Sequence, residues 1–328
     1  MNFRFIYKLF LVFAFIVSSI IFSSCTKDKV PVPEPPITID PNQCDDCTPL
    51  QPTGNTGFIE LTFLDSIYYA SPQFNPNNDN EIIFIQSISG MQRLFKLNLI
   101  TKQKTLLFEG HFSGNHISWG ANDWILLPLM DFQIWKIKSD GTQLTQVTSN
   151  GKWFHPEWNN FGDKFIAFQG YVSASLYYKI KIFEASGTIL DSINCYDGGG
   201  DWNNSLGYGV ADVNSISVFN TSSGELISDF KAETTKNYSN FTWISENEAL
   251  VTDVYGIYRY NILTKSLVKI KCSCNSKIYN LSSVNSDKTK VLFSFHEFNR
   301  VDSSTLLEQS TIYMMNVDGT NIEKIEIP

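Results

Sequence analysis

The stretch HPEWNNFGDKFIAF, His155–Phe168, has a layout that recurs along this chain. An aromatic residue, Trp158, leads into a polar turn that contains Gly162, and a short apolar run, Phe165–Phe168, follows the turn. Glycine tolerates the positive φ of tight turns, and apolar runs of this length between turn signals are consistent with buried strands. The stretch therefore predicts two short strands joined by a tight turn.

Five other segments repeat this layout at intervals of 39 to 45 residues. In each segment an apolar residue, here called the marker, precedes a polar turn and a short apolar strand. The six markers are Phe74, Trp119, Trp158, Trp202, Trp243 and Val284. A regular period of this length indicates that one supersecondary unit is repeated.

A second hairpin ends each repeat, and four of its six predicted turns contain glycine, as hairpin turns with positive φ require. These turns are Thr101-Lys102, Asp140-Gly141, Ser186-Gly187, Ser223-Gly224, Thr264-Lys265 and Asp318-Gly319. A four-stranded unit cannot bury both of its faces alone, whereas radial stacking covers each face with the next unit. We therefore predict an all-β fold for residues 57–328, a six-bladed β-propeller with four-stranded antiparallel blades.

The segment His155–Phe168 resembles the Pro-x-Trp-Ser-Pro-Asp-Gly-x-x-Ile-Ala-Phe repeat of TolB-like propellers, a PD40- and WD40-like repeat. Ile134–Thr148 and Ile312–Thr320 resemble the second half of that repeat, and the first unit keeps Pro72 and Pro76. The fourth and fifth units lack the proline, which leaves their borders open. The resemblance covers nearly all of residues 57–328 and implies six blades that form a protein-binding platform in the periplasm or at the outer membrane.

One strand-like segment, Phe58–Phe63, does not belong to a full unit. It either closes the ring by pairing with the last blade, caps the first blade, or lies along an edge. We favour ring closure, because a propeller must join its first blade to its last.

Residues 1–24 are typical of a signal peptide, since Arg4 and Lys8 precede the apolar run Leu9–Phe22. This run covers about 21 Å as a helix, short of the roughly 30 Å hydrocarbon core, so an uncleaved transmembrane anchor is the weaker alternative and simple secretion the third. The sequence from Phe22 to Cys25 resembles a bacterial lipobox of the Bacteroidota type, although Phe22 replaces the usual leucine. The resemblance implies cleavage before Cys25 and lipidation of its sulfur, with diacylglycerol and acyl chains such as palmitate.

Residues 25–56 follow as a lipidated cysteine and a Pro-rich linker, with seven of the chain's 12 prolines. Proline fixes φ and removes a hydrogen-bond donor, so this linker should be extended. Thr26 stands where a signal for inner-membrane retention would place Asp, which favours the outer membrane and leaves the periplasmic or cell-surface side open. The net charge of −8 and the pI near 5.1 argue against a nucleic-acid partner.

Two of the four histidines, His116 and His155, lie three residues before a marker. Equivalent positions of adjacent blades are neighbours in space, so we expect both near the mouth of the central channel. With Glu157, Asp201 and Asn240 they are the candidate ligand-binding residues. A catalytic metal site normally has three protein ligands, and a third histidine is not obvious, so we predict no metal and keep a polar pocket or plain hydrogen-bonded loops as alternatives.

Cysteines and glycines supply two weaker motifs. Outside the cytoplasm Cys44 and Cys47 can form a disulfide. The alternative is a zinc site formed by Cys44, Cys47, Cys272 and Cys274. The run Asp197–Asp201 resembles a calcium loop only superficially, because glycines fill its middle, so a tight turn is favoured.

No Gly-x-Ser-x-Gly nucleophile elbow and no Gly-rich phosphate loop occurs in the sequence, so we expect neither catalysis nor a cofactor. The leading hypothesis is a lipid-anchored, non-catalytic binding module for a protein of the cell envelope. A glycan or small-ligand receptor is the alternative, and a metal-dependent lyase or hydrolase that uses the two channel histidines ranks third. The receptor is favoured if four tryptophans surround a groove: Trp119, Trp124, Trp135 and Trp153.

Overall fold

The structure, a computed structural model, describes residues 67–170, 177–196, 199–203, 207–212, 214–232, 238–253, 256–272, 277–300 and 306–328. All of them belong to one compact unit, Thr38–Pro328. The predicted signal peptide, the linker with its three cysteines and the segment Phe58–Phe63 lie outside the described residues. Within the described part, no helix has both the length and the apolar character needed to cross a membrane.

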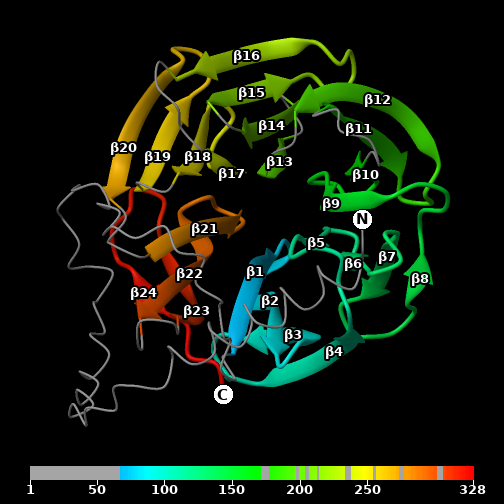
Figure 1. Cartoon of the computed structure of the whole chain (residues 1–328), viewed down its shortest axis with the longest axis vertical. Helices are drawn as coiled ribbons and strands as arrows, with labels where there is room; N and C mark the ends of the chain where they lie inside the picture. Colours follow the sequence, from blue (N-terminus) through cyan, green and yellow to red (C-terminus); the bar gives the residue numbers. More distant parts are fainter. Residues whose placement is uncertain are drawn as a thin grey trace, which may run out of the picture. The chain divides into compact units, whose positions relative to one another are not determined.

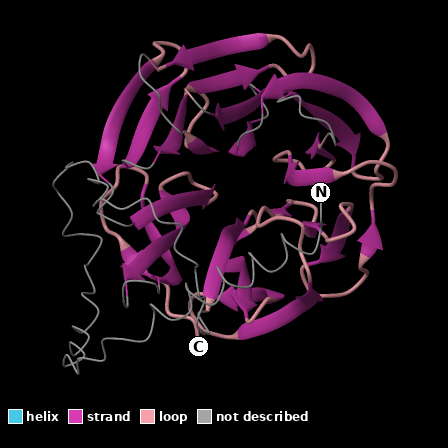
Figure 2. Cartoon of the chain, viewed as in Figure 1, coloured by secondary structure: helices cyan, strands magenta, loops and turns pink. Residues whose placement is uncertain are grey.

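Six four-stranded antiparallel sheets surround a central channel, and every regular element of the described residues is a strand (Figure 1, Figure 2). This arrangement confirms the predicted six-bladed propeller. The first three blades are β1 (Tyr68–Asn75), β2 (Asn78–Ile88), β3 (Met91–Asn98) and β4 (Lys104–Gly110); β5 (Ser118–Trp119), β6 (Trp124–Pro128), β7 (Ile134–Lys138) and β8 (Thr145–Gln146); and β9 (Trp153–Trp158), β10 (Lys164–Gln169), β11 (Tyr177–Glu184) and β12 (Ile189–Tyr196). The last three are β13 (Gly199–Asn203), β14 (Gly207–Asp212), β15 (Ser215–Phe219) and β16 (Leu226–Lys231); β17 (Ser239–Trp243), β18 (Glu248–Asp253), β19 (Gly256–Asn261) and β20 (Ser266–Cys272); and β21 (Lys277–Val284), β22 (Lys290–Arg300), β23 (Leu306–Asn316) and β24 (Glu323–Lys324).

The marker residues lie at the last or second-to-last position of the six innermost strands. In blade 3, Trp158 pairs with Phe165 across β9 and β10, as the quoted stretch predicts. The turn between these strands contains Gly162 with φ of +69° and a 2.7 Å hydrogen bond from Asn159 Nδ2 to Asp163 Oδ1. A side-chain amide that binds within its own turn is a local device that fixes the strand ends.

The outer hairpin turns lie at the positions predicted from the sequence. The four glycines in these turns, Gly141, Gly187, Gly224 and Gly319, all have positive φ. The two turns without glycine place Lys102 and Lys265 in the same region, at φ of +59° and +54°. Since a non-glycine residue in this region costs about 1–2 kcal/mol, turn geometry overrides residue preference at these two positions.

Six hydrophobic clusters hold the ring together, and each lies between two neighbouring blades. Between blades 2 and 3, for example, Leu126 and Ile134 pack with Trp153 and Phe165. Blades 6 and 1 are joined in the same way, by Leu292 and other residues of blade 6 against Phe74 and its neighbours. Every blade therefore depends on both of its neighbours for its core.

Hydrogen bonds reinforce these interfaces at a repeated position, the polar residue directly before the marker. Its side chain accepts a hydrogen bond from the backbone N–H of the next blade's marker, at a donor–acceptor distance of 2.9 Å in each of four cases. The pairs are Trp119 N to Gln73 Oε1, Trp158 N to Ser118 Oγ, Trp243 N to Asp201 Oδ2 and Phe74 N to Ser283 Oγ.

The last of these bonds joins blade 6 to blade 1 and so closes the ring. Within the described residues, each blade consists of four consecutive strands, so packing and hydrogen bonds alone make this junction. The Asp79 carboxylate accepts bonds from both the backbone N and the hydroxyl of Ser286, each at 2.9 Å. The Ser310 hydroxyl donates to the backbone oxygen of Tyr69.

Replacement of Ser283 tests this junction. We expect Ser283→Ala to lower the free energy of unfolding by about 1–3 kcal/mol, because it leaves the half-buried Phe74 N–H without its acceptor. Denaturant unfolding of the full chain measures the change. The exposed turn variant Ser222→Ala is the control and should match the wild type. Equal stability of all three proteins would show that this bond does not support ring closure.

Candidate functional site

The six innermost strands surround the axis of the ring (Figure 1). Their residues line two cavities, one towards each end of this axis. One end, here the turn face, carries the turns that join β1 to β2 and β3 to β4 and their equivalents in the other blades. The opposite end, here the connection face, carries the connections between blades. Residues near the ends of the innermost strands line the turn-face cavity, and residues near the starts of four of these strands line the connection-face cavity.

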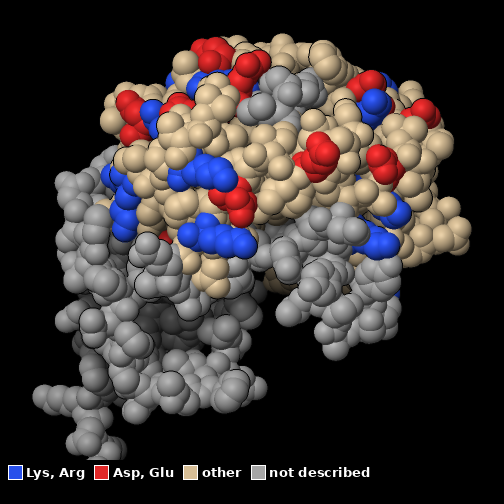
Figure 3. All heavy atoms as spheres, turned by 90° about the horizontal axis from the view of Figure 1, so that it is seen from above, with Lys and Arg blue, Asp and Glu red and all other residues tan. Residues whose placement is uncertain are grey.

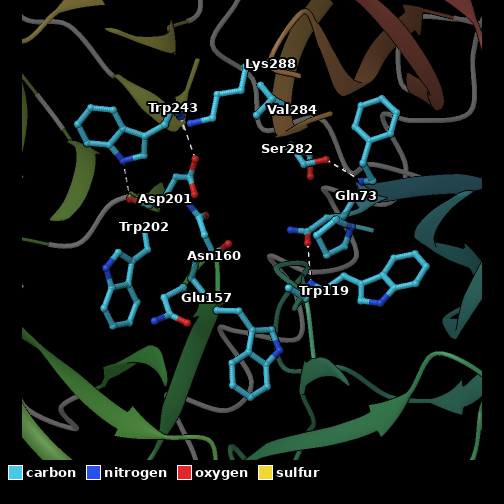
Figure 4. A pocket seen from close by; sticks show the side chains of 16 residues that line it. Gln73, Trp119, Glu157, Asn160, Asp201, Trp202, Trp243, Ser282, Val284 and Lys288 are labelled. Atoms are coloured by element: carbon cyan, nitrogen blue, oxygen red, sulfur yellow. Dashed lines mark hydrogen bonds between the residues drawn. The ribbon is translucent and has the colours of Figure 1, made fainter. Parts of the chain in front are cut away.

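The turn-face cavity has a volume of about 130 Å³ and brings together two carboxyl groups and one lysine (Figure 4). Glu157 and Asp201 come from blades 3 and 4, and Lys288 comes from the β21–β22 turn of blade 6. Gln73 and Ser283, which also link neighbouring blades, contribute polar groups to the same wall.

Asp201 is held rigidly by the next blade. Its Oδ2 accepts from the backbone N of Trp243 at 2.9 Å, and its backbone oxygen accepts from the indole Nε1 of Trp243 at 3.1 Å (Figure 4). Burial, followed by the nearby Glu157 carboxyl, raises the pKa of Asp201 to about 7, and the Trp243 N–H and Lys288 oppose this rise. This carboxyl is therefore near its titration point at neutral pH.

Glu157 connects the two ends of the channel through a 2.9 Å contact between its Oε2 and the Nε2 of His116. The two side chains keep 15% and 26% of their surface open. Burial raises the pKa of Glu157 to about 8 and lowers the pKa of His116 to about 4. These shifts favour the neutral form of both groups at pH 7, and in that form the Glu157 carboxyl is the donor to Nε2 and Nδ1 carries the imidazole proton.

The connection-face cavity is larger, about 390 Å³, and its walls are uncharged. His116 and His155 lie side by side there, with ring centroids 5.6 Å apart and ring planes 31° apart. Asn240 from blade 5 and Ser71 from blade 1 complete the wall. None of the described residues that line this cavity is Asp, Glu, Lys or Arg.

Three of these residues have left-handed backbones. Ser71, His155 and Asn240 have φ of +47°, +47° and +48°, and each lies three residues before its marker in an alternate blade. The pairing of the innermost strand with its neighbour shifts register at each of these positions, so each strand contains a β-bulge there. Bulges redirect side chains, and here they occur where the strands border the cavity.

The structure thus divides the five candidate residues between the two ends. His116, His155 and Asn240 line the connection-face cavity, Glu157 and Asp201 line the turn-face cavity, and the contact between His116 and Glu157 links the two groups. Their role in ligand binding stays a prediction. Sequence reasoning missed Lys288, Asn280 and Gln73; a polar residue precedes every marker, and that pattern signals Gln73.

The structure also bears on the possible metal ligands and on the cysteines. No three His, Cys, Asp or Glu side chains among the described residues are placed to hold a metal ion. Cys272 forms a disulfide, and its partner lies outside the residues whose side chains are described.

The predicted tight turn near residue 200 is in part wrong: Gly199–Asn203 is strand β13, and a Cβ on Gly200 would lie 2.0 Å from the Tyr208 hydroxyl. Asp197 and Gly198 lie outside the described residues.

The four tryptophans do not surround a groove. Trp119 and Trp153 are buried between blades, while Trp124 and Trp135 are half-buried against the same clusters. Lys138 Nζ lies 4.4 Å from the centroid of the Trp124 ring and covers part of it. These side chains therefore belong to the blade cores.

Comparison with known proteins identifies the fold. No family model and no curated protein matches this sequence. The C-terminal WD40 domain of Sif2 is similar with a TM-score of 0.50 and 11% identity over 82% of this chain and 96% of that one. The propeller of the trilobed protease from Pyrococcus furiosus is similar with a TM-score of 0.50 and 9% identity, over 81% of this chain and 97% of that one. An oligogalacturonate lyase in complex with manganese is similar with a TM-score of 0.51 and 11% identity, over 79% of this chain and 78% of that one. At such low identity these neighbours show the propeller fold alone.

The raised pKa of Glu157 gives a pH dependence of stability. Above pH 6.5 the unfolded carboxyl is ionised while the folded one keeps its proton, so the Glu157 contribution falls as pH rises towards 8. We expect Glu157→Gln to gain about 2 kcal/mol of unfolding free energy relative to wild type between pH 6.5 and 9, at about 1.4 kcal/mol per pKa unit.

Denaturant titrations at each pH measure this difference. The uncharged surface variant Ser222→Ala should keep the wild-type profile. Parallel profiles for the wild type and Glu157→Gln would mean that the pKa of Glu157 is not raised in the folded protein.

Proposed function

We propose that this chain is a lipid-anchored, non-catalytic binding module of the bacterial cell envelope and that its propeller binds another protein. The observation that carries the proposal is a set of exposed apolar residues at turn tips of one face. Ile100, Phe161 and Leu263 are 70%, 72% and 71% exposed, and all three lie in turns of the turn face. Large apolar side chains at this exposure cost free energy in water unless a partner covers them.

Phe161 has a special position among the three. It belongs to the β9–β10 turn, and its neighbour Asn160 lines the turn-face cavity. A partner that covers this ring would also reach the polar groups of the channel mouth. Aromatic residues next to polar groups are typical of the centre of protein–protein interfaces.

Charged side chains of both signs are mixed on the outer rim of the ring (Figure 3). On the side of the ring shown in Figure 3, acidic and basic side chains are scattered between large uncharged areas. A partner that is recognised mainly by charge would require an area of one sign. The propeller neighbours include a WD40 domain, a protease and a lyase, so the fold by itself is compatible with binding and with catalysis.

The membrane part of the proposal rests on the sequence of residues 1–56. The resemblance of the segment before Cys25 to a lipobox supports lipidation, and Thr26 supports the outer membrane. The TolB-like character of the repeat supports the same compartment.

Lipidation of Cys25 is tested by metabolic labelling. We expect cells to incorporate labelled palmitate into the wild type and not into Cys25→Ser, because the acyl chains require the processed cysteine. Cys47→Ser is the matched control and should keep the label. Mass spectrometry of the wild-type amino terminus should show a chain that begins at acylated Cys25. A wild-type chain that retains residues 1–24, or a free Cys25, would contradict the proposal.

Partner binding is tested by photo-crosslinking in intact cells. We expect a crosslinker at position 161 to trap one specific protein, whereas the same crosslinker at Leu226 on β16, which is 51% exposed, should not trap it. With the purified partner, Phe161→Ser should weaken binding at least about tenfold, equivalent to about 1.4 kcal/mol. The recovery of lipid or glycan alone from positions 100, 161 and 263 would overturn the proposed protein partner.

A further inference from the structure

We propose that the connection-face cavity is a binding site for an uncharged sugar of one or two rings. The site lies at the opposite end of the channel from the proposed partner surface, so it is a second binding activity and stands independently of the first. Its volume of about 390 Å³ is within the range of small-molecule sites in proteins.

Backbone strain is the first argument for this site. Ser71, His155 and Asn240 occupy the left-handed region without being glycine, although glycine would adopt this conformation with little strain. The cost is about 1–2 kcal/mol for Ser71 and less for His155 and Asn240, residue types that are enriched in this region, and all three lie at one repeat position around the same cavity. Strain that recurs at the wall of a cavity indicates that side chains are needed there, since such outliers cluster at ligand sites.

The polar groups on the cavity wall are the second argument. The Ser71 hydroxyl and the Asn280 side-chain amide belong to residues that line the cavity, and each can donate and accept hydrogen bonds. The Nε2 of His116 is fixed by Glu157, which leaves Nδ1–H as the other polar group of the imidazole. The wall can therefore both donate and accept hydrogen bonds.

The absence of charge selects the ligand class. No Arg or Lys among the described lining residues is present to bind a phosphate or carboxylate, and no Asp or Glu to bind a cation. Amides and hydroxyls, which donate and accept, match the adjacent hydroxyls of a sugar, and the flat rings of Tyr68 and the two histidines can cover its apolar faces. The charged groups Glu157, Asp201 and Lys288 line the other cavity.

The histidines allow a direct test, because the chain has only four. The full-length protein in detergent, labelled with ¹³C at the imidazole ε1 position, gives four signals that His→Gln variants assign. The probes are glucose, galactose, mannose, N-acetylglucosamine, maltose and lactose. We expect at least one to shift the His116 and His155 signals and to leave that of exposed His111 unchanged.

Glycine variants separate binding from folding. Ser71→Gly and Asn240→Gly keep the left-handed backbone and remove the side chain, so we expect at least about tenfold weaker sugar binding from each. Ser71→Gly should keep or raise the thermal stability, whereas Asn240→Gly also removes the 3.1 Å bond that the Thr252 hydroxyl donates to Asn240 Oδ1 and should lower it. Asn160→Ala, at the turn-face cavity, is the matched control and should bind sugar as the wild type does.

Acetate, phosphate and methylammonium serve as charged probes. The proposal would be overturned if none of the six sugars shifted the His116 and His155 signals, if a charged probe shifted them where no sugar did, or if both glycine variants bound sugar with wild-type affinity. None of these outcomes bears on crosslinking at Phe161, so the two proposals fail separately.

Discussion

Each blade of this propeller has two apolar faces, and no blade can bury either face by itself. The burial of these faces between blades is the constraint on which the rest of the structure depends. All six hydrophobic clusters lie at blade interfaces, and the one between blades 6 and 1 has the same make-up as the others. Because apolar burial is the main favourable term in folding, the ring gains full stability only when the last interface forms.

Radial packing also creates the channel and decides what lines it. The polar residue before each marker lies on an innermost strand, where it can accept a hydrogen bond from the next blade and still border the cavity. Asp201 does both, since it binds Trp243 and lines the turn-face cavity. A residue such as Asp201 therefore both stabilises a blade interface and lines the cavity, so we expect its replacement to change stability and the site together.

The two ends of the channel differ in chemistry although the repeat is the same. The turn face carries titratable groups and three exposed apolar turn tips, whereas the connection face carries neutral amides, hydroxyls and imidazoles. The contact between Glu157 and His116 joins the two ends, so the protonation of a turn-face carboxyl determines which imidazole nitrogen carries hydrogen at the connection face.

The sequence by itself determined the repeat, the six markers, the hairpin turns and the nearness of His116 to His155. These features depend on local patterns: a period of about 40 residues, glycine at turns with positive φ, and a common register between blades. Only the tertiary structure decided that Glu157 faces His116, that Ser71 and Asn240 are left-handed, and that the tryptophans are core residues. The Glu157–His116 contact and the burial of the tryptophans depend on side chains of the neighbouring blade, about 40 residues away in the chain, and the left-handed residues depend on bulges in strand pairing, so the local sequence does not reveal either.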